Sequence, residues 1–125
     1  MIAAQAIEEV GLELMRRAAI DIPEVFRAGI VELLGAEENE LSRFVLEAQI
    51  ENWQAASQDR RAMCADTGLP RFFVKLGNEA SVEGGLIALE RALRRATAEA
   101  TKEVPLRPNR VHPLSRADSN NNVGI

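Results

Sequence analysis

One segment of this chain has the alternating pattern of a β-strand, while the other long apolar segments have the spacing of helices. Residues 71–76 read Arg-Phe-Phe-Val-Lys-Leu, so Phe72, Val74 and Leu76 fall on one face of an extended strand. A lone strand in a core leaves its backbone N–H and C=O groups unpaired, at a cost on the order of 1–3 kcal/mol for each group. Its partner must be either residues 110–114, which are poor strand material, or chain outside this sequence. We therefore expect the sequence to be the first portion of a larger domain.

Helical periodicity dominates the region before this strand. Apolar residues recur every three or four positions over residues 2–18, which predicts a first helix. A break follows, where Asp21 can cap a new helix and Pro23 is tolerated in its first turn. This second helix should end near Leu34, because Gly35 suits the left-handed position that follows a helix.

The predicted third helix, about residues 38–58, carries apolar side chains on two faces. Two apolar faces on one helix indicate that other segments cover it from two sides. We expect Trp53 and the phenylalanines to be core residues, in line with the usual burial of large apolar side chains. One face comprises Leu41, Phe44, Val45 and Ala48, and the other comprises Leu46, Ile50 and Trp53.

A long fourth helix is expected over about residues 82–102, with Ser81 as its cap. Glu90 and Arg94 are four residues apart and should pair on its outer face. A tail spaced by prolines follows this helix. The predicted fold class is α+β and mostly helical, with N-terminal helices, one strand, one long helix and a loop-rich tail. The stripe expected to face inward on the long helix comprises Leu86, Leu89, Leu93, Ala96 and Ala100.

Composition restricts the class of protein. A chain of 125 residues suffices for one domain, and its 46% hydrophobic and 27% charged residues exclude a disordered or fibrous chain. No apolar run approaches the roughly 18–20 residues of a membrane span, and the N-terminal segment carries acid where a signal peptide would carry base. The single cysteine cannot form an internal disulfide. Together these features predict a cytoplasmic protein.

The net charge of −4 is unevenly divided along the chain. Acidic side chains predominate up to residue 57, and basic side chains predominate beyond it. This balance argues against DNA as a partner of the whole chain, while the second half favours a small anion.

Residues 64–68, Cys-Ala-Asp-Thr-Gly, are the segment most suggestive of chemistry, because a thiol lies on an expected loop beside an acid and a hydroxyl. Taken alone, Cys64 is a metal ligand, a nucleophile or a small buried apolar residue. Asp is a common turn residue, so Asp66 by itself is suited to capping the turn through Thr67 and Gly68. His112 is expected on a surface loop. One cysteine and one histidine cannot complete a metal site by themselves.

Four separated motifs follow one another along the chain: Met63–Gly68, Phe72–Gly77, Pro105–Asn109 and Val111–Leu114. Through them the sequence resembles the N-terminal part of the iron–sulfur hydro-lyases, that is, the class I fumarases and the alpha subunit of L(+)-tartrate dehydratase. The resemblance implies reversible dehydration of a C4 hydroxy-dicarboxylate, with a [4Fe–4S] cluster as Lewis acid. It also implies an alpha domain more than twice as long as this chain, and a beta subunit or beta domain that completes the active site.

The resemblance assigns roles to five residues. Cys64 matches the first of three cysteine ligands of the cluster, and the other two lie downstream in the family. Asp66, with Thr67 beside it, matches the acid two residues after that ligand, and the resemblance makes it the candidate for proton transfer or for orienting the group that transfers the proton, with turn capping as the alternative. Arg107, by itself an ordinary surface arginine, matches the residue that binds a substrate carboxylate through two charge-assisted bonds. Asn122 matches the second asparagine of the family's Asn-Thr-Gly-x-Asn-Thr-Gly sequence and is assigned to substrate binding.

The chain departs from the family's usual sequence in two places. Ala65 stands where the family usually has a glutamine, so the hydrogen bonds of that side chain are missing. Asp118 and Asn120 stand where the family has asparagine and glycine. Because asparagine tolerates the left-handed backbone conformation, we expect the loop to keep its shape.

The long amphipathic helices also fit a second class of function. In that alternative, the chain is a non-catalytic helical interaction module or an inactive fragment of the same family. Two further cysteines downstream would favour the enzyme, because a cluster needs thiolate ligands that this chain does not supply.

Overall fold

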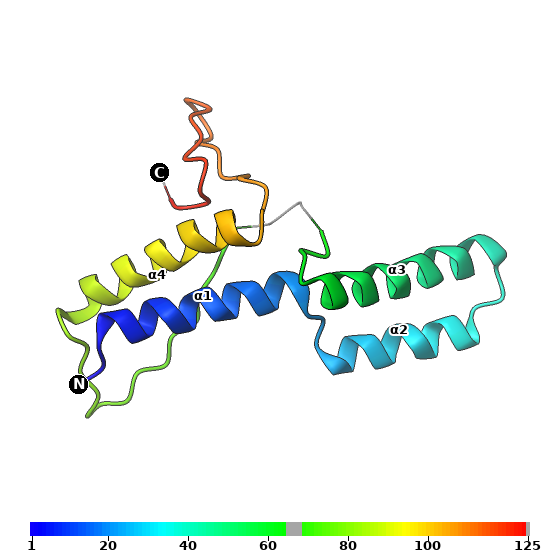
Figure 1. Ribbon diagram of the computed structural model, residues 1–125, viewed down its shortest axis with the longest axis horizontal. Helices are drawn as coiled ribbons and strands as arrows, with labels where there is room; N and C mark the ends of the chain where they lie inside the picture. The colour runs from blue at the N-terminus through cyan, green and yellow to red at the C-terminus, as the bar shows by residue number, and fades with distance from the viewer. Residues whose placement is uncertain (65–68, 125) are drawn as a thin grey trace. The chain divides into compact units, whose positions relative to one another are not determined.

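The computed structural model describes residues 1–64 and 69–124 of the chain. Within these residues the fold consists of four helices: α1 (Ala4–Ile20), α2 (Glu24–Ala36), α3 (Glu40–Asp59) and α4 (Gly85–Glu103) (Figure 1). The predicted helices are confirmed, with ends that differ by a few residues. None of the described helices has both the length and the apolar character needed to cross a membrane.

The chain divides into two compact units. One is formed by Met1–Arg16 together with Cys64–Ile125, and the other by Arg17–Met63. The first unit therefore contains most of α1, the whole of α4 and the C-terminal tail. The second unit contains α2 and α3.

In the first unit, small residues and ion pairs join α4 to α1. Ala92, Ala96 and Ala100 of α4 have no solvent exposure. Arg95 Nε donates to Glu8 Oε2 at 2.6 Å, and Arg16 Nε donates to Glu103 Oε2 at 2.9 Å. The hydrogen bond to Glu103 raises the pKa of Arg16 above its ordinary value.

The inward stripe predicted for the long helix is partly confirmed. Ala96 and Ala100 are buried, whereas Leu86 is 68% exposed and does not belong to the core. Two threonines, Thr97 and Thr101, are buried on this helix instead. The predicted outer pair is confirmed, since Arg94 Nε donates to Glu90 Oε1 at 2.9 Å.

The predicted strand is wrong. Residues 71–76 have no regular secondary structure, and Phe73 is 95% exposed. The physical reason is the missing partner, because the candidate segment 110–114 is used in a local turn, in which His112 N donates to Ala117 O at 2.8 Å. The β part of the α+β prediction is therefore not found in the described residues, and the fold is mostly helical. Their β pairing is limited to two isolated bridges, Ile2 with Val82 and Val111 with Asp118.

The start of α4 also differs from the prediction, because Ser81 does not cap it. Ser81 O accepts a hydrogen bond from Ile2 N at 2.7 Å, and Glu83 N donates to Ile2 O at 2.9 Å. Residues 81–83 are thus held by the N-terminal residues, and the helix begins only at Gly85. Gly84 and Gly85 have φ values of 75° and 73°, which glycine adopts without steric cost at the turn into the helix.

The second unit is a hairpin of α2 and α3. Asn39 caps α3, since its Oδ1 accepts from Leu41 N at 3.0 Å and from Ser42 N at 3.1 Å. Arg43 Nη1 donates to Leu34 O at 2.9 Å and so satisfies a carbonyl in the last turn of α2. The predicted end near Leu34 is wrong, because α2 continues to Ala36 and Gly35 lies inside the helix without the left-handed conformation predicted for it.

The aromatic residues divide between the core and the surface. Trp53 is 7% exposed and belongs to the core, as predicted. The same prediction is wrong for Phe26, Phe44 and Phe73, which are 64%, 66% and 95% exposed. A hairpin buries one side of each helix, so of the two apolar faces predicted for α3, the face that contains Phe44 is exposed.

Candidate functional site

Cys64 follows a residue whose main chain is held at two points. Met63 N donates to Ala19 O at 3.0 Å, and Asn52 Nδ2 donates to Met63 O at 3.0 Å. Cys64 itself is exposed, so the alternative of a small buried core residue is wrong. An accessible thiol next to an anchored residue is suited to meeting a ligand, as a metal ligand or a nucleophile must.

The other two residues of this motif with predicted roles are not placed. Asp66 and Thr67 lie outside the described residues, as does Ala65, where the sequence departs from its family. Their predicted roles in proton transfer stay predictions.

Arg107 combines an exposed side chain with a fixed main chain. On its N-terminal side, Leu106 is 4% exposed and its N donates to Thr101 O at 3.0 Å. Arg107 O accepts from Asn122 Nδ2 at 3.2 Å. On its C-terminal side, Asn109 N donates to Asn122 Oδ1 at 2.9 Å. The guanidinium group is therefore attached to a main chain that is anchored before and after it.

Asn122 lies at the centre of these contacts and is 2% exposed. Besides its bonds to the main chain of Arg107 and Asn109, its Nδ2 donates to Thr101 Oγ1 at 3.2 Å. The single hydroxyl hydrogen of Thr101 is in reach of two carbonyl acceptors, Thr97 O at 2.8 Å and Asn121 O at 3.1 Å from Oγ1. The last turns of α4, residues 107–109 and the loop of residues 120–124 are thus joined by one hydrogen-bond network.

The loop that departs from the family sequence keeps a turn geometry. Asp118 Oδ1 accepts from Asn120 N at 2.8 Å, which is an Asx-turn. Asn120 has a φ of 56°, so the prediction that asparagine replaces glycine at a left-handed position is confirmed. Asn122 has a φ of 57°. Asn121 Oδ1 accepts from Val123 N at 3.0 Å and closes the turn.

A cavity of about 300 Å³ borders this loop in the first unit. Arg110 lies directly over Gly124, since a Cβ atom at Gly124 would be 2.7 Å from Arg110 Nη2. The lining combines apolar side chains with the Glu90–Arg94 ion pair and the side chain of Arg110. It is lined by Pro70, Phe72, Val74, Leu89, Glu90, Leu93, Arg94, Thr97, Arg110, Asn122, Val123 and Gly124.

Sequence reasoning missed Thr101 and Arg110. A signal for Thr101 was present, because a hydroxyl four residues after Thr97 and next to the inward Ala100 must find a buried hydrogen-bond partner. No comparable signal pointed to Arg110, since its position over Gly124 depends on the fold of the tail.

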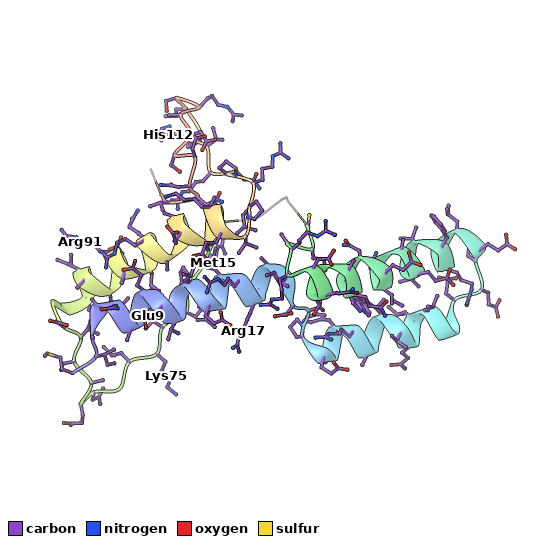
Figure 2. All side chains as sticks on the ribbon, in the orientation of Figure 1. Glu9, Met15, Arg17, Lys75, Arg91 and His112 are labelled. Carbon is purple, nitrogen blue, oxygen red and sulfur yellow. The ribbon has the colours of Figure 1, made fainter. Side chains whose placement is uncertain are left out.

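His112 acts as a turn cap in the tail beyond α4 (Figure 2). Its Nδ1 accepts from Leu114 N at 3.3 Å and from Ser115 N at 3.1 Å. His112 thus lies in a loop, as the sequence predicted.

Residues 8–124 match the sequence pattern of the protein family described as fumarate hydratase (Fumerase). The chain belongs to this family. The resemblance to class I fumarases and the alpha subunit of tartrate dehydratase is thereby confirmed.

Two relatives that the chain matches are named as L(+)-tartrate dehydratase alpha subunits, the first of them as putative. The putative L(+)-tartrate dehydratase subunit alpha of Methanocaldococcus jannaschii is 38% identical over 119 residues, which are 95% of this chain and 41% of that protein. The L(+)-tartrate dehydratase subunit alpha of Escherichia coli K12 is 32% identical over 93 residues, which are 74% of this chain and 30% of that protein. The chain therefore spans less than half the length of these relatives.

The Fumerase family implies an iron–sulfur cluster, for which this chain supplies few donor atoms. The described residues contain no group of three or more His, Cys, Asp or Glu side chains that could hold a metal ion. The sequence supplies one thiol, Cys64. Cube-type clusters are held by several thiolates, so these residues fit one corner of a cluster and do not fit a complete site.

Proposed function

We propose that this chain is part of the alpha subunit of a hydro-lyase that reversibly dehydrates a C4 hydroxy-dicarboxylate, either malate to fumarate or tartrate to oxaloacetate. The observation that carries the proposal is the family match over residues 8–124. The names of the relatives, tartrate dehydratase alpha subunits, support the same class of reaction.

In the proposed enzyme, Cys64 is one ligand of a [4Fe–4S] cluster whose other cysteine ligands lie outside this sequence. The exposure of Cys64 supports this role, because a thiolate that reaches a cluster cannot be enclosed in the core of its own segment. When bound, the cluster supplies a Lewis acid that makes the hydroxyl group a better leaving group.

Arg107 is proposed to bind one carboxylate of the substrate. A guanidinium group donates two parallel bonds to a carboxylate, which fixes the orientation of the substrate as well as its charge. The exposed side chain and anchored main chain of Arg107 support this role, because less freedom is lost when the carboxylate binds. Asn122, which is bonded to Arg107 O, is proposed to belong to the same substrate-binding region.

Asp66, with Thr67 beside it, is proposed to handle the proton of the reaction. Dehydration breaks the C–O bond of the hydroxyl group, removes a proton from the neighbouring carbon and forms a C=C bond, so that water is the second product. A carboxylate held near that carbon accepts the proton, and in the reverse direction the carboxylic acid returns it. With tartrate, the enol formed by this step becomes oxaloacetate by tautomerisation.

A beta subunit is the proposed partner. The relatives are named alpha subunits, which supports a second kind of chain in the complete enzyme. The exposed apolar side chains of α2 and α3 support a protein partner as well, because such side chains commonly mark interaction surfaces. The same observation favours the second candidate function, a non-catalytic helical interaction module.

One experiment separates the two candidates. The complete protein that contains this sequence is produced with its beta subunit without oxygen, supplied with iron and sulfide, and assayed with L-malate and with L(+)-tartrate. We expect dehydration of one of these two acids. The proposed location of the enzyme in the cell is the cytoplasm. An iron-loaded complex that dehydrates neither acid would contradict the enzyme and favour the interaction module.

A further inference from the structure

The side-chain amide of Asn122 is used almost entirely inside the protein. Its two N–H groups go to Thr101 Oγ1 and Arg107 O, each at 3.2 Å, and its oxygen accepts from Asn109 N at 2.9 Å. Asn122 is 2% exposed. An amide has two donor hydrogens and one acceptor oxygen, so both donors are occupied before any substrate arrives. Asn122 is therefore poorly suited to donate a hydrogen bond to a substrate carboxylate.

Hydrogen bonds hold the main chain both before and after the Cα of Arg107. Arg107 O and Asn109 N are the main-chain groups that follow its Cα, and both bind the one amide. Before the Cα, the contact of Leu106 N with Thr101 O at 3.0 Å ties the chain to α4. Thr101 links the two anchors, since its main chain holds Leu106 and its hydroxyl accepts from Asn122.

We propose that Asn122 is a positioning residue, which acts on the substrate through Arg107 and does not touch the substrate itself. This inference rests on the proposed function, in which Arg107 binds a substrate carboxylate. The contacts of Asn122 fix the main chain of residues 107–109, and they thereby fix the point from which the guanidinium group extends. Thr101 supports the same arrangement, because its hydroxyl holds the Asn122 amide in place on α4. We call the contacts of Asn122 with Thr101, Arg107 and Asn109 the clasp.

The position of the Arg107 main chain matters because a two-bond contact between a guanidinium group and a carboxylate is directional. A displacement of about 1 Å in a substrate-holding group can cost on the order of 100-fold in rate or affinity. A clasp at the Arg107 main chain limits such displacement before the substrate binds, which lowers the ordering cost of binding.

The test replaces the two donors of Asn122 with an acceptor of the same shape. In Asn122→Asp, the contacts to Thr101 Oγ1 and Arg107 O lose their donor, while the acceptor for Asn109 N stays. The matched control is Asn121→Asp, one residue earlier, where the oxygen that accepts from Val123 N is kept. Both variants are made in the complete alpha and beta complex and assayed with the dicarboxylate that the wild type dehydrates.

A positioning role predicts a specific pattern of kinetics. For Asn122→Asp we expect a KM that is about 10- to 100-fold higher, with kcat within about threefold of the wild type. In an Arg107→Gln background, the same change should raise KM no further, because its effect passes through Arg107. Asn121→Asp should leave both constants unchanged. Equal effects of Asn122→Asp in both backgrounds, or no effect on KM, would overturn the proposal.

A second measurement separates this proposal from the proposed function. Hydrogen exchange at the Asn109 amide reports the clasp directly and needs no turnover. In Asn122→Ala we expect exchange of that amide to become at least about tenfold faster, while amides within α3 keep their rates. Unchanged exchange at Asn109 would overturn the clasp even in an active enzyme. An inactive wild type with faster exchange in the variant would contradict the proposed function and leave the clasp supported.

A further variant is needed if Asn122→Asp does not fold. Thr101→Val removes the hydroxyl that Asn122 Nδ2 binds but leaves the contacts of Asn122 with Arg107 and Asn109. We expect a smaller rise in KM, about 3- to 10-fold, again with little change in kcat. A KM equal to that of the wild type would overturn the role of the clasp.

Discussion

Gly11 of α1 lies directly against Ala96 of α4. A Cβ atom at Gly11 would be 3.1 Å from the Cβ of Ala96 and 3.0 Å from Leu93 Cδ2. Contacts this short require a neighbour to move. Leu93 can rotate its side chain, but the Ala96 Cβ moves only with the helix backbone. The absence of a side chain at Gly11 is thus a condition for the close approach of these helix segments in the first unit.

Gly11→Ala should destabilise the protein. The gain in helix propensity, up to about 1 kcal/mol, is outweighed by overpacking, which typically costs about 1–3 kcal/mol. The matched control is Gly29→Ala in α2, where an added Cβ meets no atom within 4 Å. This control should stabilise the protein by up to about 1 kcal/mol. Denaturant unfolding of both variants measures the difference, and equal stabilisation by both would contradict the close packing at Gly11.

Asn39→Ala should weaken the hairpin of the second unit. The Asn39 side chain accepts hydrogen bonds from two main-chain N–H groups at the start of α3, and loss of such a cap typically costs about 1 kcal/mol. Asn39→Asp is the control, because its carboxylate can accept the same two bonds. Urea unfolding followed by circular dichroism should separate the two variants. The cap would be unimportant if Asn39→Ala unfolded at the same urea concentration as Asn39→Asp.

Arg107→Lys should weaken substrate binding more than turnover. An ammonium group keeps the charge but loses the two-bond geometry, and one charge-assisted bond is worth roughly 1.5–3 kcal/mol. This corresponds to a KM about 10- to 100-fold higher. Arg91→Lys is the control, since Arg91 is an exposed arginine of α4 (Figure 2). Steady-state kinetics of the complete enzyme tests both, and an unaltered KM in Arg107→Lys would remove Arg107 from the site.

Local patterns in the sequence sufficed for the helices and for parts of the tail. The three-to-four-residue spacing of apolar residues predicted all four helices because helix hydrogen bonds are made within the segment itself. The left-handed conformation of Asn120 was also predictable, because it depends on the side chain of one residue.

Features that depend on distant partners could not be predicted in this way. The alternation of residues 71–76 predicts a strand only where another strand is present to pair with it, and the described residues offer none. Residues 81–83 are held by Ile2, about eighty positions earlier in the chain, which delays the start of α4. Burial of Phe26 and Phe44 requires a covering segment, and one hairpin does not cover both sides of its helices.

In the candidate site, too, local features were predictable from the sequence and features that depend on distant partners were not. The motif positions of Cys64 and Arg107 were recognisable from sequence, whereas the inward orientation of the Asn122 amide was not. That orientation follows from three contacts that join residues 101, 107, 109 and 122, which no single motif contains.

The most direct test of the central claim compares iron binding by the wild type and by Cys64→Ala. Both are prepared as the complete alpha and beta complex without oxygen, and iron content, visible absorbance and circular dichroism are measured. Because Cys64 is exposed, its loss should leave the helical signal unchanged. We predict a broad iron–sulfur absorbance and hydro-lyase activity in the wild type, and the loss of both in the variant. Equal iron content and absorbance in the two proteins would contradict the account.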